Sequence, residues 1–485
     1  MRRVLVLLIV VWAGCTKPNQ DFCCASDAQC SALGSDELRP CQSGLACNAG
    51  TCVAKECDTS ADCSDPSKPV CILNLCEARC ESNADCDGLP DRPLCASDGV
   101  CVGCIDSSQC PADANICDAE DRTCRGCESD DECPGGVCIE SSGMCVADAE
   151  VVFVSSVGAD SGTCTRSAPC ASLGFAFGKV NASRPVMHLL GGKLNVNATV
   201  SLTAPVTIDG TNNMLTAPAT GPIFSVSNAA HAAIENVMLG TANGAVVTVQ
   251  GGGSAELYAT SLAGSGVTVS NGSFAATAST FAMSGVTCSN GGTVTVETSS
   301  FTPGGIGGTG CSITMRRNRF DGITSHALFV DGGSVVMENN LLTTPSEFVD
   351  MVHAGGGAPG STIRFNTFVN TSSLLQSPNA IDCDASIDVT SNVFAYNSTN
   401  PINGTGCVTH ASLFDVPGAV DAGAADFSGD AALFFVDRAA GDFHLAAQSP
   451  AVERGEAGLV TVDLDGHARP DPAGSAPDVG AFEAP

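Results

Sequence analysis

Eight copies of a short phrase between residues 231 and 394 constrain the fold of this chain more than any other feature. Each phrase is a small polar residue, then any residue, then a large apolar residue, and successive phrases begin 24, 19, 20, 19, 22, 26 and 26 residues apart. A period of this length predicts stacked units, each of them too small to bury its own apolar face. The polar positions are Asn236, Thr260, Ser279, Ser299, Asn318, Asn340, Asn366 and Asn392. The apolar positions are Met238, Leu262, Phe281, Phe301, Phe320, Leu342, Phe368 and Phe394.

The repeating unit is predicted to be rich in strands. Apolar and polar residues alternate before several phrases, as in residues 294–297 and 387–390, and this alternation is typical of strands rather than helices. Gly, Asn and Ser punctuate every repeat. One strand-rich turn of about 20 to 26 residues, repeated, predicts an all-β parallel β-helix, in which each coil advances by about 4.8 Å. The apolar positions then form an internal stack, and the polar positions form a hydrogen-bonding ladder at a corner.

The repeat resembles the right-handed parallel β-helix of the pectate-lyase-like superfamily. Two flanking segments share the resemblance: residues 160–173 look like the usual opening of exported bacterial β-helix proteins, and residues 435–451 and 478–483 look like their usual ending. The likeness covers about residues 151–485. Because this superfamily contains lyases, hydrolases, adhesins and surface proteins, the resemblance implies the fold and leaves the activity open.

Residues 1–15 have the features of an export signal. Two arginines precede an apolar run over residues 4–11, and small residues precede Cys15. This order is typical of a secretory signal peptide, and the run is too short to span a bilayer as a stable helix. Ala13-Gly14-Cys15 resembles the lipobox of bacterial lipoproteins, although Trp12 stands where that family usually has Leu. The resemblance implies lipidation of Cys15 and an outer-membrane, cell-surface address; the alternative is an ordinary cleaved signal and a secreted protein.

Residues 16–150 carry 22 of the 29 cysteines and are predicted to form disulfide-stapled modules. After a first group of six cysteines, four modules of four cysteines begin at Cys57, Cys80, Cys104 and Cys127, 23 or 24 residues apart. An even number of cysteines behind an export signal indicates disulfides, which replace the core that modules of this size cannot build. Three pairings within each module stay open. The repeats resemble the Dickkopf N-terminal or EB type in their cysteine spacing.

The chain is strongly acidic, with a formal net charge of −31. This charge repels nucleic acid and anionic lipid, so nucleic acid is excluded as a partner and the lipid anchor is the expected membrane contact. Acidic clusters such as Asp130-Asp131-Glu132 either keep the chain soluble or bind calcium weakly, because Ca²⁺ takes several hard oxygen ligands. No other cofactor is predicted.

A change of composition near residues 147–150 separates the modules from the β-helix, which is assigned to residues 151–407. Residues 408–485 are assigned to a C-terminal cap, because an open β-helix end would expose unpaired strand edges. Cysteines one coil apart can lie at bonding distance on adjacent coils, and two pairs have spacings of 23 and 24 residues. The expected disulfides between coils are Cys288–Cys311 and Cys383–Cys407. A third pair, Cys164–Cys170, is expected across a tight loop at the start of the β-helix.

Any catalytic group is predicted to lie between Arg316 and His410, because residues 194–315 contain no basic residue and four acids. The best candidate is Asp382-Cys383-Asp384. On a strand the two Asp side chains share a face, with Cα atoms about 6.5 to 7 Å apart, which suits the carboxyl separation of about 6.5 to 9.5 Å in inverting glycosidases. Asp331 lies at nearly the same phase two coils away. The alternative is that these acids are solvated turn or surface groups.

Three further side chains could assist these acids: His326, His353 and Arg364. For a β-helix lyase the resemblance implies a Lys or Arg base with carboxylate-bound Ca²⁺, and for a hydrolase it implies clustered Asp residues. A Lys base within the coils is excluded, because no Lys follows Lys193.

Two functions are compatible with these features. The first is a non-catalytic, monomeric surface lipoprotein, in which the modules form a protease-resistant stalk and the β-helix presents a polar face for adhesion or for binding an extracellular polysaccharide. The second is a polysaccharide lyase or inverting glycoside hydrolase. Sparse ionisable groups favour the first function. Aromatic residues also argue against a sugar-processing cleft, because most Phe are expected in the core and the one Trp lies in the signal peptide.

Overall fold

The structure is a computed structural model in which the chain forms two compact units, residues 1–127 and 128–485. Residues 63–64 and 79–484 are described, apart from 88, 90, 113, 241–243, 265, 346–349, 358–359, 373–378, 385, 397, 399, 417–424 and 472–473. Only the backbone is described for residues 45–48, 51–54, 70–72, 75–77, 211–212 and 357. The predicted signal peptide and the predicted lipidation site Cys15 lie outside the described residues. Within the described part of the chain, no helix is long and apolar enough to cross a membrane.

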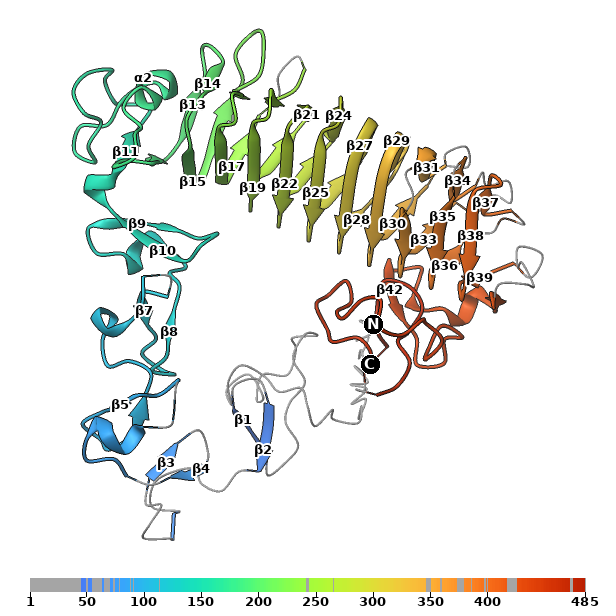
Figure 1. Ribbon diagram of the computed structural model, residues 1–485, viewed down its shortest axis with the longest axis horizontal. Helices are drawn as coiled ribbons and strands as arrows, with labels where there is room; N and C mark the ends of the chain where they lie inside the picture. The colour runs from blue at the N-terminus through green and yellow to red at the C-terminus, as the bar shows by residue number, and fades with distance from the viewer. Residues whose placement is uncertain are drawn as a thin grey trace, which may run out of the picture. The chain divides into compact units, whose positions relative to one another are not determined.

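The first unit consists of small antiparallel hairpins, each one belonging to a cysteine module (Figure 1). Two modules also contain a 3-10 turn, η2 (Asn83–Cys86) or η3 (Ser107–Gln109). The hairpins are β1 (Leu45–Asn48) with β2 (Thr51–Ala54), β3 (Val70–Ile72) with β4 (Leu75–Glu77), β5 (Leu94–Cys95) with β6 (Cys101–Val102), and β7 (Ile116–Cys117) with β8 (Cys124–Arg125).

The pairing within the second and third four-cysteine modules joins the first cysteine to the third and the second to the fourth. Before the second cysteine, Asp85 Oδ2 accepts hydrogen bonds from the N–H groups of Glu81 and Ser82. Gln109 caps the next module in the same way. The repeated acid or amide at this position therefore holds the chain's own backbone. The disulfides are Cys80–Cys95, Cys86–Cys101, Cys104–Cys117 and Cys110–Cys124.

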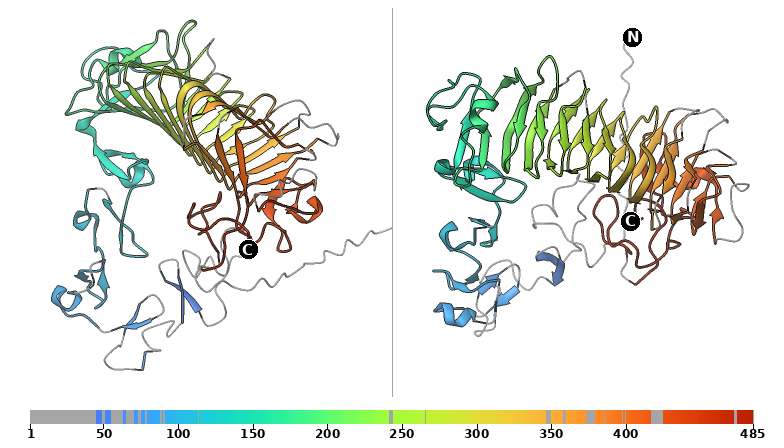
Figure 2. Two further views of the ribbon diagram at one scale, coloured as in Figure 1. Left: turned by 45° about the vertical axis from the view of Figure 1, so that its right-hand side comes forward. Right: turned by 45° about the horizontal axis from the view of Figure 1, so that its top comes forward.

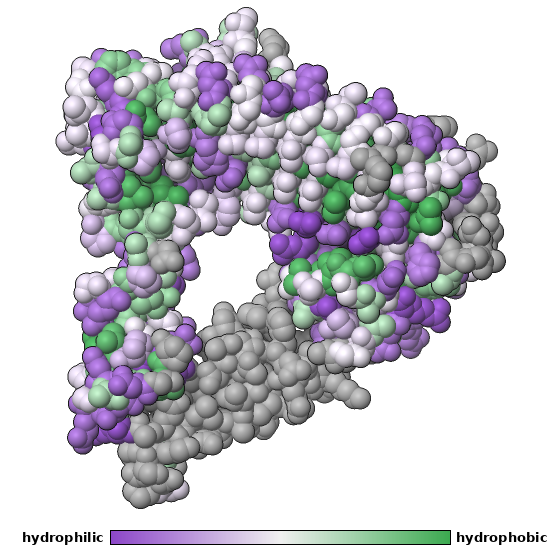
Figure 3. Space-filling view, viewed as in Figure 1, coloured by the Kyte–Doolittle hydropathy of each residue, from purple (hydrophilic) through white to green (hydrophobic). Residues whose placement is uncertain are grey.

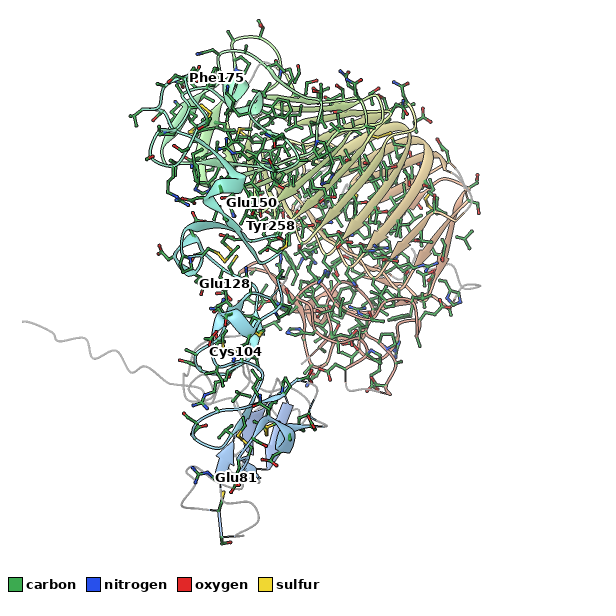
Figure 4. All side chains as sticks on the ribbon, turned by 60° about the vertical axis from the view of Figure 1, so that its left-hand side comes forward. Glu81, Cys104, Glu128, Glu150, Phe175 and Tyr258 are labelled. Atoms are coloured by element: carbon green, nitrogen blue, oxygen red, sulfur yellow. A yellow bond between two sulfur atoms is a disulfide. The ribbon has the colours of Figure 1, made fainter. Side chains whose placement is uncertain are left out.

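From residue 128 on, the fourth module belongs to the same compact unit as the β-helix. The Cys133–Cys145 disulfide closes it. Val137 and Ile139 of the module pack against Val151 and Phe153 of the first coil. Figure 4 labels Glu128 and Glu150, between which the module runs. Its elements are η4 (Asp130–Glu132), β9 (Gly136–Ile139), β10 (Met144–Ala147) and η5 (Asp148–Glu150).

The second unit is a parallel β-solenoid of about nine turns, in which thirty strands follow one another from β11 to β40 (Figures 1 and 2). Each coil bends at corners, so the strands stack on three parallel faces. The first face contains β11 (Val151–Val154), β12 (Val186–Leu189), β19 (Ser254–Tyr258), β22 (Ser273–Thr277), β25 (Thr293–Glu297), β32 (Thr362–Arg364), β35 (Ile387–Thr390) and β38 (Cys407–His410).

Shorter strands form the other two faces, and four long strands run around a corner. The second face contains β13 (Lys193–Asn195), β20 (Ser261–Ala263), β23 (Thr280–Ala282), β26 (Ser300–Thr302), β28 (Arg319–Phe320), β30 (Leu341–Thr344), β33 (Thr367–Asn370), β36 (Val393–Ala395), β39 (Leu413–Phe414) and β40 (Phe427–Ser428). The third face contains β14 (Val200–Leu202), β16 (Phe224–Val226), β18 (Val247–Gln250), β21 (Val267–Ser270), β24 (Val286–Ser289), β31 (Val352–Gly357), β34 (Ile381–Cys383) and β37 (Ile402–Asn403). The long strands are β15 (Val206–Thr216), β17 (His231–Leu239), β27 (Ile306–Arg316) and β29 (Leu328–Glu338).

The apolar positions of the repeat form the predicted internal stack, with one correction. The rings of Phe281 and Phe301 stack with centroids 4.4 Å apart. Met238, however, is 43% exposed, and Leu239 is the residue that pairs with Leu262. The first phrase is offset because Asn236 has a φ of 56° and occupies the left-handed corner position that Ala259, with a φ of 46°, takes in the next coil. The polar residue of that phrase thus comes one position early.

The polar positions form a buried ladder at the corner between the first and second faces. The side-chain amide of Asn318 donates to Asn340 Oδ1 at 2.9 Å, Asn340 donates to Asn366 at 2.9 Å, and Asn366 donates to Asn392 at 3.1 Å. Each amide also donates to backbone carbonyls, as Asn340 does to Met315 at 3.0 Å. The corner therefore joins successive coils by side-chain as well as backbone hydrogen bonds.

Disulfides also join coils. The structure contains all three expected pairs, Cys164–Cys170, Cys288–Cys311 and Cys383–Cys407. A short helix, α2 (Leu173–Phe177), follows the first pair.

The C-terminal segment covers the outside of the last coils. Coils continue through β40, and the segment that follows contains η7 (Ala431–Leu433), β41 (Phe435–Asp437) and β42 (Asp442–Leu445). Its apolar residues, among them Phe434 and Phe482, pack against Leu341 and Val393 on the outer side of the second face. In earlier coils Ser261 holds the corresponding outward position. The late coils therefore carry apolar residues at an outward position that is polar in an earlier coil, and the C-terminal segment buries these apolar residues.

Candidate functional site

One outward row of the third face changes its chemistry along the solenoid. Strand register places its members on successive coils, and we call it the outer row. The early coils contribute small residues, whereas the late coils contribute an aromatic ring, an imidazole, a carboxylate and an amide. Its members are Thr248, Thr268, Thr287, Gly307, Phe329, His353, Asp382 and Asn403.

Two rings of the outer row stack on each other. Phe329 and His353 lie with ring centroids 4.8 Å apart and 15° between their planes. His326 lies edge-on to Phe329 at 5.4 Å. Phe329 points outward because Leu328 and Val330 on either side of it point into the core, and its side chain is 39% exposed. Phe329 is therefore an exception to the expectation that most phenylalanines lie in the core.

The carboxylate of Asp382 is held from two sides. Its Oδ2 lies 3.1 Å from His353 Nδ1, and its Oδ1 accepts a hydrogen bond of 2.9 Å from the amide of Asn403. This contact turns the other imidazole nitrogen, Nε2, towards Gly355, where a Cβ would lie 3.3 Å from Nε2 and 3.3 Å from Asp331 Oδ1. The glycine thus leaves open a space that a carboxylate and an imidazole border.

Two further ionisable groups lie close to these residues. Burial raises the pKa of Asp350, and the charge of Asp382 raises it further. Burial also lowers the pKa of His326. Asp350 is thus biased towards its protonated form beside Asp382. Two carboxyl groups in different environments can divide the roles of general acid and general base.

The predicted site residues are divided among neighbouring positions. Asp382 lies at the centre of the cluster. Asp384 is exposed, and its N–H donates to Ala354 O at 3.2 Å. Asp331 is exposed and pairs in register with Gly355. His326 and His353 belong to the cluster.

Arg364 does not belong to the cluster. It lies on the first face and pairs with Asp388 at 2.9 Å. On the same face Arg316 pairs with Glu338 at 2.8 Å, so the outward charges there compensate one another.

Sequence reasoning missed Phe329, Asp350 and Asn403 as members of the cluster. A signal existed for Phe329, because it occupies the polar phase of an alternating strand, between Leu328 and Val330. The positions of Asp350 and Asn403 depend on loops of unequal length, so their register could not be counted from the repeat.

A shallow groove of about 660 Å³ runs along the solenoid beside the outer row and ends at Phe329 and His326. Its floor lies just before the strands of the third face begin. Three glycines on successive coils, Gly266, Gly285 and Gly305, form part of this floor. A Cβ on Gly266 would lie 2.0 Å from the oxygen of Gly285, and one on Gly285 would lie 2.2 Å from the oxygen of Gly305. Since no side chain fits there, close coil packing itself keeps the groove open.

The remaining lining is made mostly of small or hydroxyl-bearing residues from four coils. In Figure 3 the visible side of the coils is coloured mainly in pale and hydrophilic shades. Because each coil advances about 4.8 Å, the groove extends for about 15 to 20 Å. The hydroxyl-bearing lining residues are Thr268, Ser284, Thr287, Thr324 and Ser325.

Comparison with known proteins adds a likeness of fold. No protein-family model matches the chain, and no curated protein matches it. A similar solved structure is described as the crystal structure of pectate lyase Pel9A, with 13% sequence identity and a TM-score of 0.40 over 70% of this chain and 100% of that chain. Similarity at this level carries no argument about the residues of the groove.

Proposed function

We propose that this chain is an exported protein that binds an extended glycan in the groove of the third face. The observation that carries the proposal is the exposed Phe329 ring, which lies at the end of a hydroxyl-lined groove and next to the oriented pair His353 and Asp382. Sugar rings present an apolar face that packs on an aromatic ring, and their hydroxyl groups need donors and acceptors placed around it. The groove and the outer row together supply both.

The charge of the site favours a neutral glycan. Asp331, Asp350, Asp382 and Asp384 all lie on the third face or in the loops beside it, and the chain carries a formal net charge of −31. A polyuronate would be repelled by these carboxylates. We therefore propose a neutral, hydroxyl-rich polysaccharide as the ligand class.

Export and surface attachment belong to the same proposal. The disulfides of the modules and coils support it, because disulfides persist in oxidising compartments outside the cytosol. Lipidation at Cys15 would anchor the chain, and the cysteine modules would serve as a stalk that carries the β-helix away from the membrane.

The test is equilibrium binding of the purified protein to a panel of neutral and acidic polysaccharides, with Phe329→Ala as the variant. The matched control is Val408→Ala, because Val408 is an apolar residue of the first face that is 59% exposed. We expect binding to a neutral polysaccharide that Phe329→Ala weakens about tenfold, since an aromatic contact contributes about 1 to 1.5 kcal/mol. Preference for acidic polysaccharides, or equal binding by Phe329→Ala and wild type, would contradict the proposal.

Hydrolysis of the bound glycan is the second candidate function. It is supported by Asp382, which is oriented by His353 and Asn403, and by Asp350, whose pKa burial raises. The former could act as the base and the latter as the acid. Release of reducing ends that is lost in Asp382→Asn would establish hydrolysis, and binding without new reducing ends would leave the protein as a binding module.

A further inference from the structure

A second cluster of ionisable side chains lies where the fourth cysteine module covers the first coils. His188, Asp209 and Glu235 are in register on β12, β15 and β17, so they form a row on the outer side of the first face. An outward row would ordinarily meet solvent. Here the three residues are 3%, 2% and 1% exposed. Hydrogen bonding of Ser141 to Glu235 and the approach of Asp130 to His188 show that the module covers them.

The imidazole of His188 lies between two carboxylates. Its Nδ1 is 2.6 Å from Asp209 Oδ2, and its Nε2 is 3.4 Å from Asp130 Oδ2. The other oxygen of Asp130 accepts the N–H of Cys138 at 2.8 Å, which fixes the aspartate within the module. Asp130 is thus held in place by a group outside its contact with His188.

The third member of the row, Glu235, has an unused oxygen. Its Oε2 accepts the N–H of Ser141 at 2.9 Å. Its Oε1 is buried and has no hydrogen-bond partner among the described residues. A buried carboxylate oxygen without a partner is unfavourable, and the neighbouring acid Asp209 adds like charge.

Arg166 lies near the cluster, but its main partner is Asp148. Arg166 makes hydrogen bonds of 2.7 to 3.0 Å to both oxygens of Asp148 and donates to Gly136 O. Asp130 and Asp209 thus flank the imidazole of His188, and Glu235 is the next acid of the buried row. A buried set of like charges is stable when a cation or protons neutralise it.

The geometry at His188 suits a metal ion. When Nδ1–H donates to Asp209, the lone pair of Nε2 faces the lone pairs of Asp130 Oδ2. Two ligands of a tetrahedral zinc ion, at about 2.0 to 2.2 Å from the metal, lie about 3.4 Å apart, which matches the separation of 3.4 Å between His188 Nε2 and Asp130 Oδ2. A carboxylate that orients the other nitrogen of a ligating histidine is the usual outer partner at zinc sites.

We propose that Asp130 and His188 bind a divalent transition-metal ion of the zinc class at this junction. Asp209 acts as a positioning residue through His188 Nδ1. The candidate atoms of Asp130, His188 and Asp209 lie within 4.8 Å of one another. Because Asp130 belongs to the module and His188 to the first coils, the ion would fasten the last cysteine module onto the β-helix. This inference is independent of glycan binding.

The experiment is a metal titration of the full, chelator-treated protein followed by calorimetry and thermal unfolding. Zn²⁺ is expected to bind with one ion per chain and to raise the unfolding temperature. Asp130→Asn should weaken Zn²⁺ binding by more than about 100-fold, and Asp209→Asn by about 10- to 100-fold. Asparagine at residue 130 can still accept the N–H of Cys138, so the module keeps its fold. Asp131→Asn is the matched control, because Asp131 is an exposed acid of the same turn.

A second readout separates a metal site from a general effect on folding. Co²⁺ bound in place of Zn²⁺ should give a visible absorption spectrum of nitrogen and oxygen ligation, which disappears in His188→Gln while the spectrum of Asp131→Asn stays as in wild type. Three results would overturn the proposal. Absence of Zn²⁺ binding would leave His188 as a hydrogen-bonding partner of the aspartates alone. Binding unchanged in Asp130→Asn would place the ion elsewhere. Preference for Ca²⁺ that Asp131→Asn abolishes would place it on the exposed turn of residues 130–132.

Discussion

His353 Nδ1 lies 3.1 Å from Asp382 Oδ2, and the two residues are neighbours on adjacent coils because β31 and β34 pair in register. The contact is thus set by the period of the solenoid, not by closeness in sequence, since 29 residues separate the two. It orients an imidazole whose ring also stacks on Phe329. One hydrogen bond therefore links the polar and the aromatic parts of the proposed glycan site.

Asp382→Asn should weaken glycan binding without unfolding the protein. The asparagine amide cannot accept hydrogen bonds at both ends, so it loses either His353 or Asn403 and frees the imidazole to turn. We expect a loss of affinity of about three- to tenfold, which corresponds to the roughly 1 kcal/mol of a typical hydrogen bond. Isothermal titration calorimetry would measure it. Asp384→Asn, which changes an exposed neighbouring acid, should bind as wild type does; an equal loss in both variants would assign the effect to charge alone.

Gly285→Ala should destabilise the solenoid and partly fill the groove. The new Cβ would lie 2.2 Å from the carbonyl oxygen of Gly305, so the coils must move apart. We expect a decrease of about 1 to 3 kcal/mol in the free energy of unfolding in urea. Gly307→Ala is the matched control, because its Cβ would have its nearest neighbour at 3.9 Å. Similar stability of the two variants would show that the glycine stack is not constrained by coil packing.

Asn340→Ala should interrupt the corner ladder. Its amide donates to two backbone carbonyls and to Asn366, and its Oδ1 accepts from Asn318. Each buried group left without a partner costs about 1 to 3 kcal/mol, so the free energy of unfolding should fall by several kcal/mol. Asn195→Ala, at an exposed position of β13, is the control. A loss no larger than that of the control would mean that backbone pairing alone holds the corner.

The C-terminal segment should become less stable as the pH rises through 9. The hydrogen bond to Asp465 and a second one to Asp442 raise the pKa of His444 to about 9, above its ordinary value of 6.5. A folded-state pKa above the unfolded value gives stability that is fully present below pH 6.5 and is lost between pH 6.5 and 9. The side chain of His444 is 44% exposed, so screening keeps the contribution below about 1 kcal/mol.

Urea unfolding of wild type and His444→Gln at pH 6.0, 7.5 and 9.5 (about these values, chosen to bracket the pKa change) would check this pH dependence. The difference between the two proteins should shrink with rising pH. A difference that stays constant across the series would show that His444 is held by packing instead of charge.

The fold could be predicted from the sequence because every coil repeats the same two contacts, an apolar stack and a polar ladder. Phe281, Phe301 and Phe320 recur at almost equal intervals for this reason. The spacing of 23 residues between Cys288 and Cys311 likewise corresponds to about one coil. The prediction was wrong at Met238, because the polar residue of that phrase, Asn236, lies one position earlier in the corner than Thr260 does in the next coil. The repeat period predicts the length of a coil. Whether one side chain points into the core or outwards also depends on the backbone conformation of the corner before it.

The site was only partly predictable, because it depends on register between coils of unequal length. Asp382 stood out in a chain with few acids in its central coils. Its contact with His353 and the stacking of Phe329 could not be derived from the sequence. The repeated phrase fixes the register of the first and second faces, but a loop of variable length lies between the phrase and β31 on the third face. The row of His188, Asp209 and Glu235 on the first face could not be predicted as a buried cluster either, because it is buried only where the fourth module covers it.

The most direct test of the proposed function is amide hydrogen exchange of the protein with and without a bound neutral oligosaccharide. We expect slower exchange over β24, β31, the third-face halves of β27 and β29 (residues 306–309 and 328–331) and the loops that line the groove, with the first face unchanged. Protection confined to the first face or to the C-terminal segment would contradict it and would place the ligand away from Phe329 and Asp382.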